Sequence, residues 1–401
     1  MAQTGRMTSR KLRAIAAVDA LGRPAFALLR SRGRKAPPDP PRRILVVELW
    51  GIGDVVLATP ALAELRDRLP NARVTLLGKA HARELLENSG LVDDVIVADF
   101  PWTAHAAKYA PSRYRRANLT QVFRELRSRK FDVSIDARRD LRSNIVTFLS
   151  GATRRIGYDF GGGSKLLTDV VPSGSQDGHR IDDWMHVLEP LMGEIPSARG
   201  PVLRVTDDEI ARAEHHLREL GIPDGKTLIA IHPGASHPIR RLRADVVAAA
   251  AARIIASGAA AILIQDPGGH GSDFVLPAGV PALRPSLREL MAIISSVDGL
   301  VCSDSSAMHI AVALGTPVTA VFGPQRHEWL GPRDPMHRIV SITDMPCRPC
   351  FDACIYESPL CMDRIDGQMV VEAVDGQLAA LAARTAEASA QGSGRRRLPR
   401  A

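Results

Sequence analysis

The chain is poor in cysteine and has no uninterrupted apolar run near its start. Five of its 401 residues are cysteine, and four of the five lie in one short segment. This distribution excludes the disulfide framework of a small secreted domain. The early apolar stretch, residues 14–29, is broken by Asp19, Arg23 and Pro24, so we expect no secretory signal. A cytoplasmic protein with a soluble body is therefore expected.

The sequence also lacks an apolar stretch suited to crossing a membrane. Its best candidate, "VVAAAAARIIASGAAAILI" at residues 246–264, contains Arg253 and the helix-ending pair Ser257 and Gly258. A spanning helix needs about 20 consecutive apolar residues. We expect a helix followed by a strand instead.

The chain has an excess of basic residues only in its first segment. The net charge is +8, and residues 1–43 contain eleven Lys or Arg and two Asp, which leaves 41 basic and 42 acidic residues in 44–401. Nucleic-acid enzymes carry their basic residues along a groove of the folded body. We therefore expect no nucleic-acid partner.

Two series of short apolar runs, rich in Val, Ile and Leu, predict the architecture. The first includes "RILVVEL" and "FDVSIDAR", and the second includes "TLIAIHPG", "LVCSDSS" and "PVTAVFG". Buried parallel strands have this pattern, and the helical stretches between them have the length of crossover connections. We expect an α/β protein with two doubly wound, Rossmann-like domains facing a cleft. The predicted boundaries are a basic helix and Pro-rich linker over 1–43, domains over 44–205 and 206–385, and a disordered basic tail over 386–401.

The stretch "WGIGDVV" joins the first strand to a helix. Gly51 and Gly53 permit a tight turn, but a dinucleotide site would have a third glycine where this chain has Val56, and an acidic residue where it has Lys79. Asp54, at the start of a helix, would repel a pyrophosphate. Two interpretations stay open for Asp54: a residue that caps the helix, or a general base.

A second candidate site follows the strand "LVCS". Asp304, Ser305 and Ser306 come directly before a helix, whose first amides bind diphosphates well, and the hydroxyls add donors. His309, one turn later, would reach a phosphate oxygen. The alternative is an ordinary capped helix with His309 packed inside.

A third candidate is the turn "HPGASHPIRRLR". Gly234 and Ser236 lie in the turn, and Arg240 leads a group of three arginines. Fixed cations of this kind can stabilise a phosphate-bearing leaving group, as a bound metal can. Since no carboxylate cluster indicates a metal, we assign that task to Arg240. A solvated arginine-rich surface is the alternative.

The four clustered cysteines have the spacing C-x2-C-x3-C-x6-C. Four thiolates would hold structural zinc or an iron–sulfur cluster, but the second half lacks a C-x2-C pair. We expect no metal, and a cluster-carrying redox protein is the open alternative. The residues concerned are Cys347, Cys350, Cys354 and Cys361.

Four segments, in order, resemble glycosyltransferase family 9, the lipopolysaccharide heptosyltransferases. They are "ILVVELWGIGDVVLATPALAELRDRLPNARVTLLG", "IAIHPGASHPIRRLRADVV", "LVCSDSSAMHIAVALGTPVTAVFGP" and "CRPCFDACIYESPLCMDRI". The resemblance implies a GT-B fold, an ADP-heptose donor, an inverting mechanism without metal or cofactor, and a lipid-linked saccharide acceptor. Asp54 falls on the family's catalytic base, in an acceptor-binding N-terminal domain; the C-terminal domain would bind the nucleotide sugar.

Where the family usually has Gly and Trp, this chain has Ser306 and Leu242. These departures leave a non-catalytic, nucleotide-binding or scaffold protein as the alternative function. Residues 8–32 combine apolar residues with Arg and Lys concentrated at both ends, and we expect them to form an interfacial helix on an anionic membrane, with the body peripheral to the cytoplasmic face. A solvated tail is the other interpretation of that segment.

Overall fold

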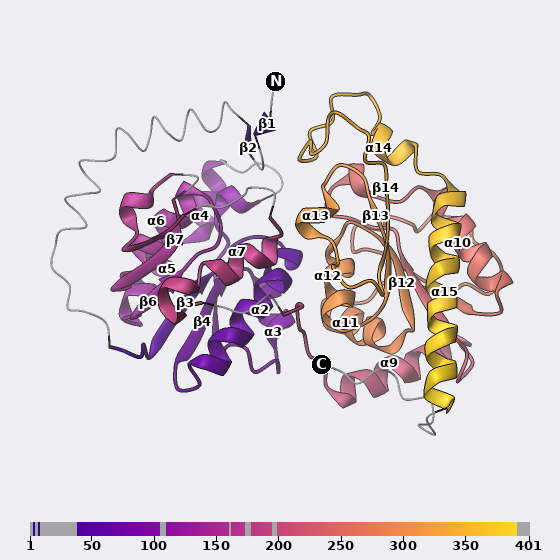
Figure 1. The fold of residues 1–401 in the computed structure, drawn as a ribbon, viewed down its shortest axis with the longest axis horizontal. Coiled ribbons are helices and arrows are strands. Elements are labelled where there is room, and N and C mark those ends of the chain that lie inside the picture. Colours follow the sequence, from indigo (N-terminus) through magenta and orange to yellow (C-terminus); the bar gives the residue numbers. More distant parts are fainter. Residues whose placement is uncertain are drawn as a thin grey trace. The chain divides into compact units, whose positions relative to one another are not determined.

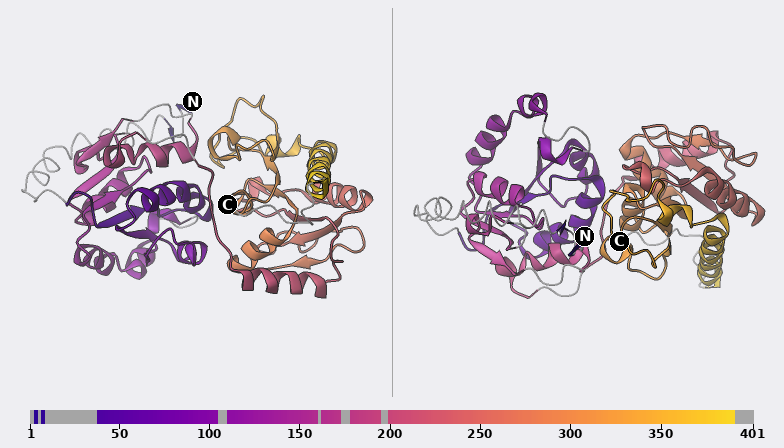
Figure 2. Two further views of the ribbon diagram at one scale, coloured as in Figure 1. Left: turned by 60° about the horizontal axis from the view of Figure 1, so that its bottom comes forward. Right: turned by 90° about the horizontal axis from the view of Figure 1, so that it is seen from above.

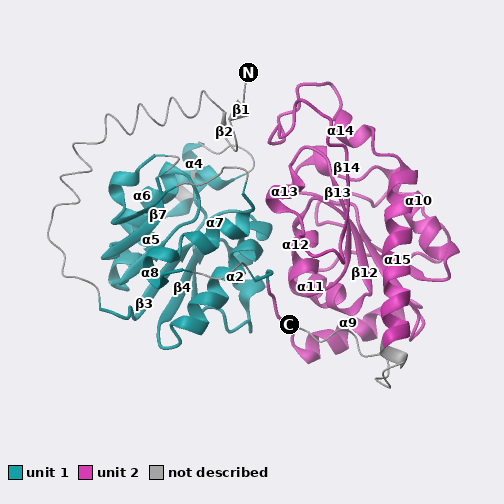
Figure 3. Cartoon of the chain, in the orientation of Figure 1, with its two compact units in different colours: residues 1–201 teal, residues 202–401 magenta. Residues whose placement is uncertain are grey.

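The computed structural model describes residues 3–4, 7–8, 38–104, 110–159, 162–172, 178–194 and 199–390. The chain divides into two compact units, residues 1–201 and 202–401 (Figure 3). The expected membrane helix falls on residues outside the described part, apart from Thr8 in a short antiparallel pair, β1 (Gln3–Thr4) and β2 (Met7–Thr8). The division falls four residues before the boundary expected at 205.

Unit 1 is built on a six-stranded parallel sheet (Figure 1). The order of its strands is β5-β4-β3-β6-β7-β8, so the first strand of the unit lies beside the fourth, as in a Rossmann fold. Its strands are β3 (Arg43–Val47), β4 (Arg73–Gly78), β5 (Asp94–Val97), β6 (Val133–Ile135), β7 (Arg154–Tyr158) and β8 (Asp169–Val171).

Helices cover both faces of this sheet (Figure 2). Leu45 and Val47 of β3 pack with Leu126 and Val146, which come from the two helices on one face. Because side chains alternate along a strand, Ile44 and Val46 are buried on the other face. The helices of unit 1 are α2 (Ile52–Arg68), α3 (Ala80–Leu86), α4 (Pro111–Ala117), α5 (Leu119–Ser128), α6 (Leu141–Leu149), α7 (Arg180–His186) and α8 (Glu189–Met192), with 3-10 turns η1 (Pro101–Thr103) and η2 (Ser164–Leu166).

Unit 2 repeats this topology with strands in the order β11-β10-β9-β12-β13-β14, all parallel. Its strands are β9 (Leu228–His232), β10 (Ala260–Ile264), β11 (Ala282–Leu283), β12 (Gly299–Ser303), β13 (Val318–Phe322) and β14 (Arg338–Ser341). Its helices are α9 (Asp207–Glu219), α10 (Ala244–Ala256), α11 (Leu287–Ser296), α12 (Ser306–Ala313), α13 (His327–Leu330), α14 (Leu360–Asp363) and α15 (Gly367–Ala390), with the turn η3 (Pro238–Arg240).

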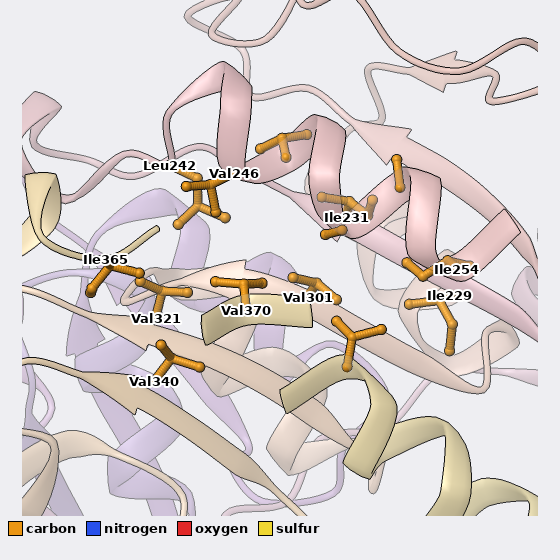
Figure 4. Close-up of a cluster of buried hydrophobic side chains, with 14 of the residues drawn as sticks. Ile229, Ile231, Leu242, Val246, Ile254, Val301, Val321, Val340, Ile365 and Val370 are labelled. Carbon is orange, nitrogen blue, oxygen red and sulfur yellow. The ribbon is translucent and has the colours of Figure 1, made fainter. Parts of the chain in front are cut away.

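The core of unit 2 lies between the sheet and the helices α10 and α15 (Figure 4). Val246 of α10 and Val370 of α15 pack against Ile231 and Val301 of the two central strands. Leu242, which stands where a family Trp was expected, is buried in the same cluster and is 2% exposed. An apolar side chain thus keeps this part of the core closed.

Every apolar run that the sequence analysis assigned to a strand is a strand, which confirms the fold class. The stretch 246–264 forms α10 and β10, separated by Gly258 at a φ of +86°. Helix α15 continues to Ala390, beyond the expected start of the tail at 386. Among the described residues, every helix is too short or too polar to traverse a bilayer.

The strand order of each sheet indicates where a ligand would bind. In doubly wound sheets, ligands bind beyond the carboxyl ends of the strands where the strand order reverses. These points lie between β3 and β6 in unit 1, and between β9 and β12 in unit 2. Asp54 follows β3, and the turn with Gly234 and the segment with Asp304 follow β9 and β12.

Candidate active site

Asp54 lies in the first turn of α2, with Gly51 as the N-cap residue. Its Oδ2 accepts the backbone N–H of Gly51 at 3.1 Å, and its Oδ1 accepts a hydrogen bond from Arg138 Nη1 at 2.5 Å. The side chain of Asp54 keeps 25% of its surface exposed. It therefore makes the capping contact, and it also forms an ion pair at a site that solvent reaches.

The partner of Asp54 comes from the neighbouring strand. Arg138 follows β6, which pairs with β3, and its guanidinium lies over the Trp50 ring at 4.4 Å. Gly51 has a φ of −86°, so the turn does not require the left-handed region there. Gly53 is the second residue of the helix. The ring and the carboxylate together hold Arg138 in place.

These contacts keep Asp54 ionised. Burial alone would raise its pKa, but the guanidinium groups of Arg138 and Arg180 and the Gly51 N–H lower the pKa of Asp54 to about 2. A negative charge at the first turn of a helix is stabilised further by the helix dipole. The expectation of a carboxylate that is charged at neutral pH agrees with this geometry.

Near Asp54 lies a group of three buried titratable residues that the sequence analysis missed. Glu48 and Asp136 are each 1% exposed and directly follow the neighbouring strands β3 and β6, while Arg180 begins α7. Arg180 Nη1 donates to the Ala137 carbonyl at 2.6 Å, and its Nη2 is 3.7 Å from Glu48 Oε2. The signal was present in the sequence, since polar residues directly after adjacent buried strands meet at one sheet edge.

The two buried carboxyl groups do not titrate like surface carboxylates. Burial and the negative charge of Asp54 raise the pKa of Glu48 to about 7, against the lowering effect of Arg138 and Arg180. Burial raises the pKa of Asp136 well above its usual range. Near neutral pH, Glu48 is thus close to its midpoint.

In unit 2, the structure brings the turn after β9 against the segment after β12. Ser303 Oγ donates to the Gly234 carbonyl at 2.6 Å, which ties the two segments together. A Cβ added at Gly234 would lie 2.7 Å from Asp266 Oδ2, so only glycine fits there. Ser236, two residues later, is exposed. The two predicted parts of this site therefore lie side by side.

Helix α12 begins at Ser306, with Ser305 as its N-cap. The Ser305 side chain makes no capping hydrogen bond, and its buried Oγ has no hydrogen-bond partner among the described residues. His309 is 8% exposed, in the first turn of the same helix. The first amides of α12 are thus not capped by that hydroxyl, which is the arrangement an anion needs.

Arg240 is the arginine of its group that faces this helix. It makes two hydrogen bonds to Asp352, at 2.7 and 2.5 Å, and lies 3.3 Å from Asp304 Oδ2. Arg243 instead binds Asp245 and the carbonyls of Met362 and Asp363. The interpretation of the whole run as a solvated surface therefore does not hold for Arg240, whose side chain is 19% exposed.

Two carboxylates share the charge of Arg240. Asp304 is buried, and burial raises its pKa, while Arg240 lowers it and Asp352 raises it. Asp352 has a φ of +65° and lies between Cys350 and Cys354, in the cysteine-containing segment. Sequence analysis missed Asp352, because nothing in the spacing links residue 352 to the turn at 240.

The cysteines of this segment are all free thiols. Burial raises the pKa of Cys361 to about 11, so that thiol is protonated near neutral pH. Across the described ranges, His, Cys, Asp and Glu form no group of three or more arranged to hold a metal.

Comparison with known proteins identifies relatives of the whole two-unit body. The profile described as "Glycosyltransferase family 9 (heptosyltransferase)" matches residues 119–359. Lipopolysaccharide heptosyltransferase 2 of Escherichia coli (strain K12) is 21% identical over 318 residues, 75% of this chain and 88% of that protein. The Haemophilus influenzae lipooligosaccharide heptosyltransferase 2 is 22% identical, with 75% and 89% covered.

A solved structure shares the fold. The glycosyl transferase family 9 structure from Veillonella parvula superposes with a TM-score of 0.69 at 21% identity, covering 87% of this chain and all of that one. The E. coli ADP-heptose lps heptosyltransferase II gives 0.67 at 19% identity, with 84% and 99% covered. Two doubly wound parallel sheets in series are the GT-B fold, as expected from the sequence.

Proposed function

This chain belongs to glycosyltransferase family 9, and from that premise we propose that it transfers a heptosyl group from ADP-heptose to a lipid-linked saccharide such as the lipopolysaccharide core. The observation that carries the proposal is Asp54, an ionised and partly exposed carboxylate at the switch point of the unit 1 sheet. The names of the relatives supply the sugar and the type of acceptor.

Asp54 is the proposed general base. Its carboxylate would accept the proton of an acceptor hydroxyl while the hydroxyl oxygen attacks the anomeric carbon and the bond to the diphosphate breaks. Attack on the face opposite the leaving group inverts the anomeric configuration. Hydrogen bonds from Gly51 and Arg138 fix the direction of the carboxylate.

The donor is proposed to bind unit 2. The first amides of α12 and the hydroxyls of Ser305 and Ser306 would hold the diphosphate, and Arg240 and His309 would stabilise the charge that develops on the departing ADP. Fixed donors of this kind replace a divalent ion, so the proposed mechanism is independent of metal. The turn with Gly234 and Ser236 would lie along the nucleotide.

A thermal-shift panel of ADP, GDP, UDP and CDP, with their sugar conjugates, tests the donor assignment. A ligand at about 100 times its Kd stabilises the folded state by about 2.7 kcal/mol. We expect ADP and ADP-heptose to raise the Tm, and the other nucleotides to raise it much less. A larger Tm increase with a different base would contradict the ADP assignment and leave the transferase chemistry in place.

We place the enzyme at the cytoplasmic face of the membrane that carries its acceptor. The support is sequence alone: residues 8–32 carry basic and apolar groups together. Each Lys or Arg near an anionic surface contributes about 1 kcal/mol to binding. The full chain should pellet with anionic vesicles at low salt, and deletion of residues 1–35 should release it. Equal pelleting of both proteins would exclude the role of this segment.

A further inference from the structure

Besides Asp54, the unit 1 site contains the buried carboxyl group of Glu48. It directly follows β3, and its Oε1 accepts the backbone N–H of Trp50 at 3.2 Å. Its Oε2 is buried and has no hydrogen-bond partner within the described part of the chain. A buried carboxyl oxygen without a hydrogen-bond partner lowers the free energy of unfolding, so it calls for a functional explanation.

Glu48 and Asp54 compete for the same cations. Arg138 and Arg180 act on both carboxylates, and Asp54 itself acts on Glu48. Arg138 is hydrogen-bonded to Asp54, while Arg180 has its Nη2 turned to Glu48 at 3.7 Å. A charge placed on Glu48 therefore weakens the hold of the two guanidinium groups on Asp54.

We propose that Glu48 is a positioning residue, whose ionisation weakens the stabilisation of the Asp54 carboxylate by Arg180 and Arg138 and so makes Asp54 a stronger base. When Glu48 is neutral, Arg138 and Arg180 stabilise the Asp54 carboxylate alone, and its affinity for a proton is low. When Glu48 is ionised, it shares the cations and repels the charge on Asp54, so that affinity increases. The inference rests on the proposed role of Asp54 as the base.

Burial separates the roles of the two carboxylates. Glu48 is 1% exposed and cannot touch an acceptor, whereas the side chain of Asp54 is 25% exposed. Glu48 thus acts through its neighbours. Because the pKa of Glu48 is about 7, its charge changes near neutral pH.

Other titratable groups face this pair from the surrounding elements. Burial raises the pKa of Asp136, which directly follows β6, well above its ordinary value. His81 has a pKa lowered by burial and by the charge of Lys79. Against the lowering effect of burial, the carboxylates of Asp54 and Glu48 raise the pKa of Arg138, so Arg138 stays charged. The pKa of Glu48 itself is about 7.

The pH dependence of kcat/KM tests this inference, because it reports the groups of the free enzyme. For the wild type, we expect kcat/KM to rise by up to about tenfold from about pH 6 to about pH 8.5, the upper limit for a shift of about one pKa unit in the base. Glu48→Gln should abolish the rise and stay near the low-pH value. Both proteins use the same substrates, so any titration of the substrates cancels in their ratio.

A matched control and a rescue variant complete the design. Glu64→Gln changes another buried glutamate, which pairs with Arg68 at the far end of α2, and should leave the profile unchanged. Glu48→Asp keeps an ionisable group and should restore the rise with a displaced midpoint. If Glu48→Gln fails to fold, Glu48→Asp decides alone, and an unchanged midpoint would overturn the inference.

The pH dependence of the Tm supplies an independent readout. The pKa of Glu48 is about 7 in the folded protein and 4.5 ordinarily, so its contribution to stability is full below about 4.5 and is lost as the pH rises through 7. The Tm of the wild type should therefore fall relative to Glu48→Gln in that range. If the Tm difference between the wild type and Glu48→Gln grew with pH while the ratio of their kcat/KM values stayed constant, Glu48 would titrate without acting on Asp54. Normal activity of Asp54→Asn would instead refute the base assignment.

Discussion

Asp54→Asn should lower kcat by about 10²–10⁴-fold, the usual contribution of a general base, with donor affinity unchanged. Asparagine has nearly the shape of aspartate, and its carbonyl oxygen can still accept the Gly51 N–H. It has no useful basicity, so the acceptor hydroxyl would attack with its proton still bound. Steady-state kinetics with saturating donor would measure the loss.

The loss should not come from unfolding. The pair of Asp54 and Arg138 is partly exposed, and pairs of that type contribute about 1 kcal/mol or less to the free energy of unfolding. Asp169→Asn is the matched control: Asp169 pairs with Arg154 at 2.8 Å and is 24% exposed, but it lies on the edge strand β8. Equal activity of the two variants would exclude Asp54 as the base.

Arg240→Ala should weaken the binding of ADP and of the sugar donor by about 10- to 100-fold, the effect of losing hydrogen bonds to a charged group worth about 1.5–3 kcal/mol. Arg240 is the guanidinium that faces the turn before α12, where it lies 3.3 Å from Asp304. Isothermal titration calorimetry with ADP would measure the change. Because ADP binds without the acceptor, the result is independent of the role of Asp54.

Two further variants sharpen that experiment. Asp352 holds Arg240 through two hydrogen bonds, so it competes with a diphosphate for this cation. Asp352→Asn should therefore tighten ADP binding, by about three- to tenfold, opposite in sign to Arg240→Ala. Arg243→Ala removes a neighbouring arginine that donates hydrogen bonds to Asp245 and to the carbonyls of Met362 and Asp363. It should leave ADP affinity unchanged. Weaker binding in all three variants would indicate general damage to the unit.

The apolar runs predicted most strands of the two six-stranded sheets, the edge strands β5 and β14 included, and missed β7, β8 and β11. Strand β7 contains Arg154 and Arg155, whose side chains bind Asp169 and the Leu166 carbonyl, so it has no apolar pattern. Strands β8 and β11 are edge strands of three and two residues. Pairing with a neighbouring strand, rather than apolar content, makes these segments β-structure.

The candidate sites divide in the same way. Residues on the glycine turns were found, because a turn after a buried strand is visible in one segment of sequence. Arg138 was missed as the partner of Asp54, because their proximity depends on the pairing of β3 with β6. Asp352 was missed because a left-handed turn, 112 residues from Arg240, brings it back to the site. Long-range neighbours of this kind follow from topology and not from spacing.

The central claim is heptosyl transfer by this chain, and mass spectrometry of the acceptor tests it most directly. The purified full-length protein would be incubated with ADP-heptose and a lipopolysaccharide acceptor that lacks the outer heptose, in the presence of EDTA. We predict that the acceptor gains the mass of one heptosyl group, joined in the anomeric configuration opposite to that of the donor, and that Asp54→Asn slows the gain by about 10²–10⁴-fold. An acceptor of unchanged mass, or transfer that occurs only after a divalent ion is restored, would contradict the account.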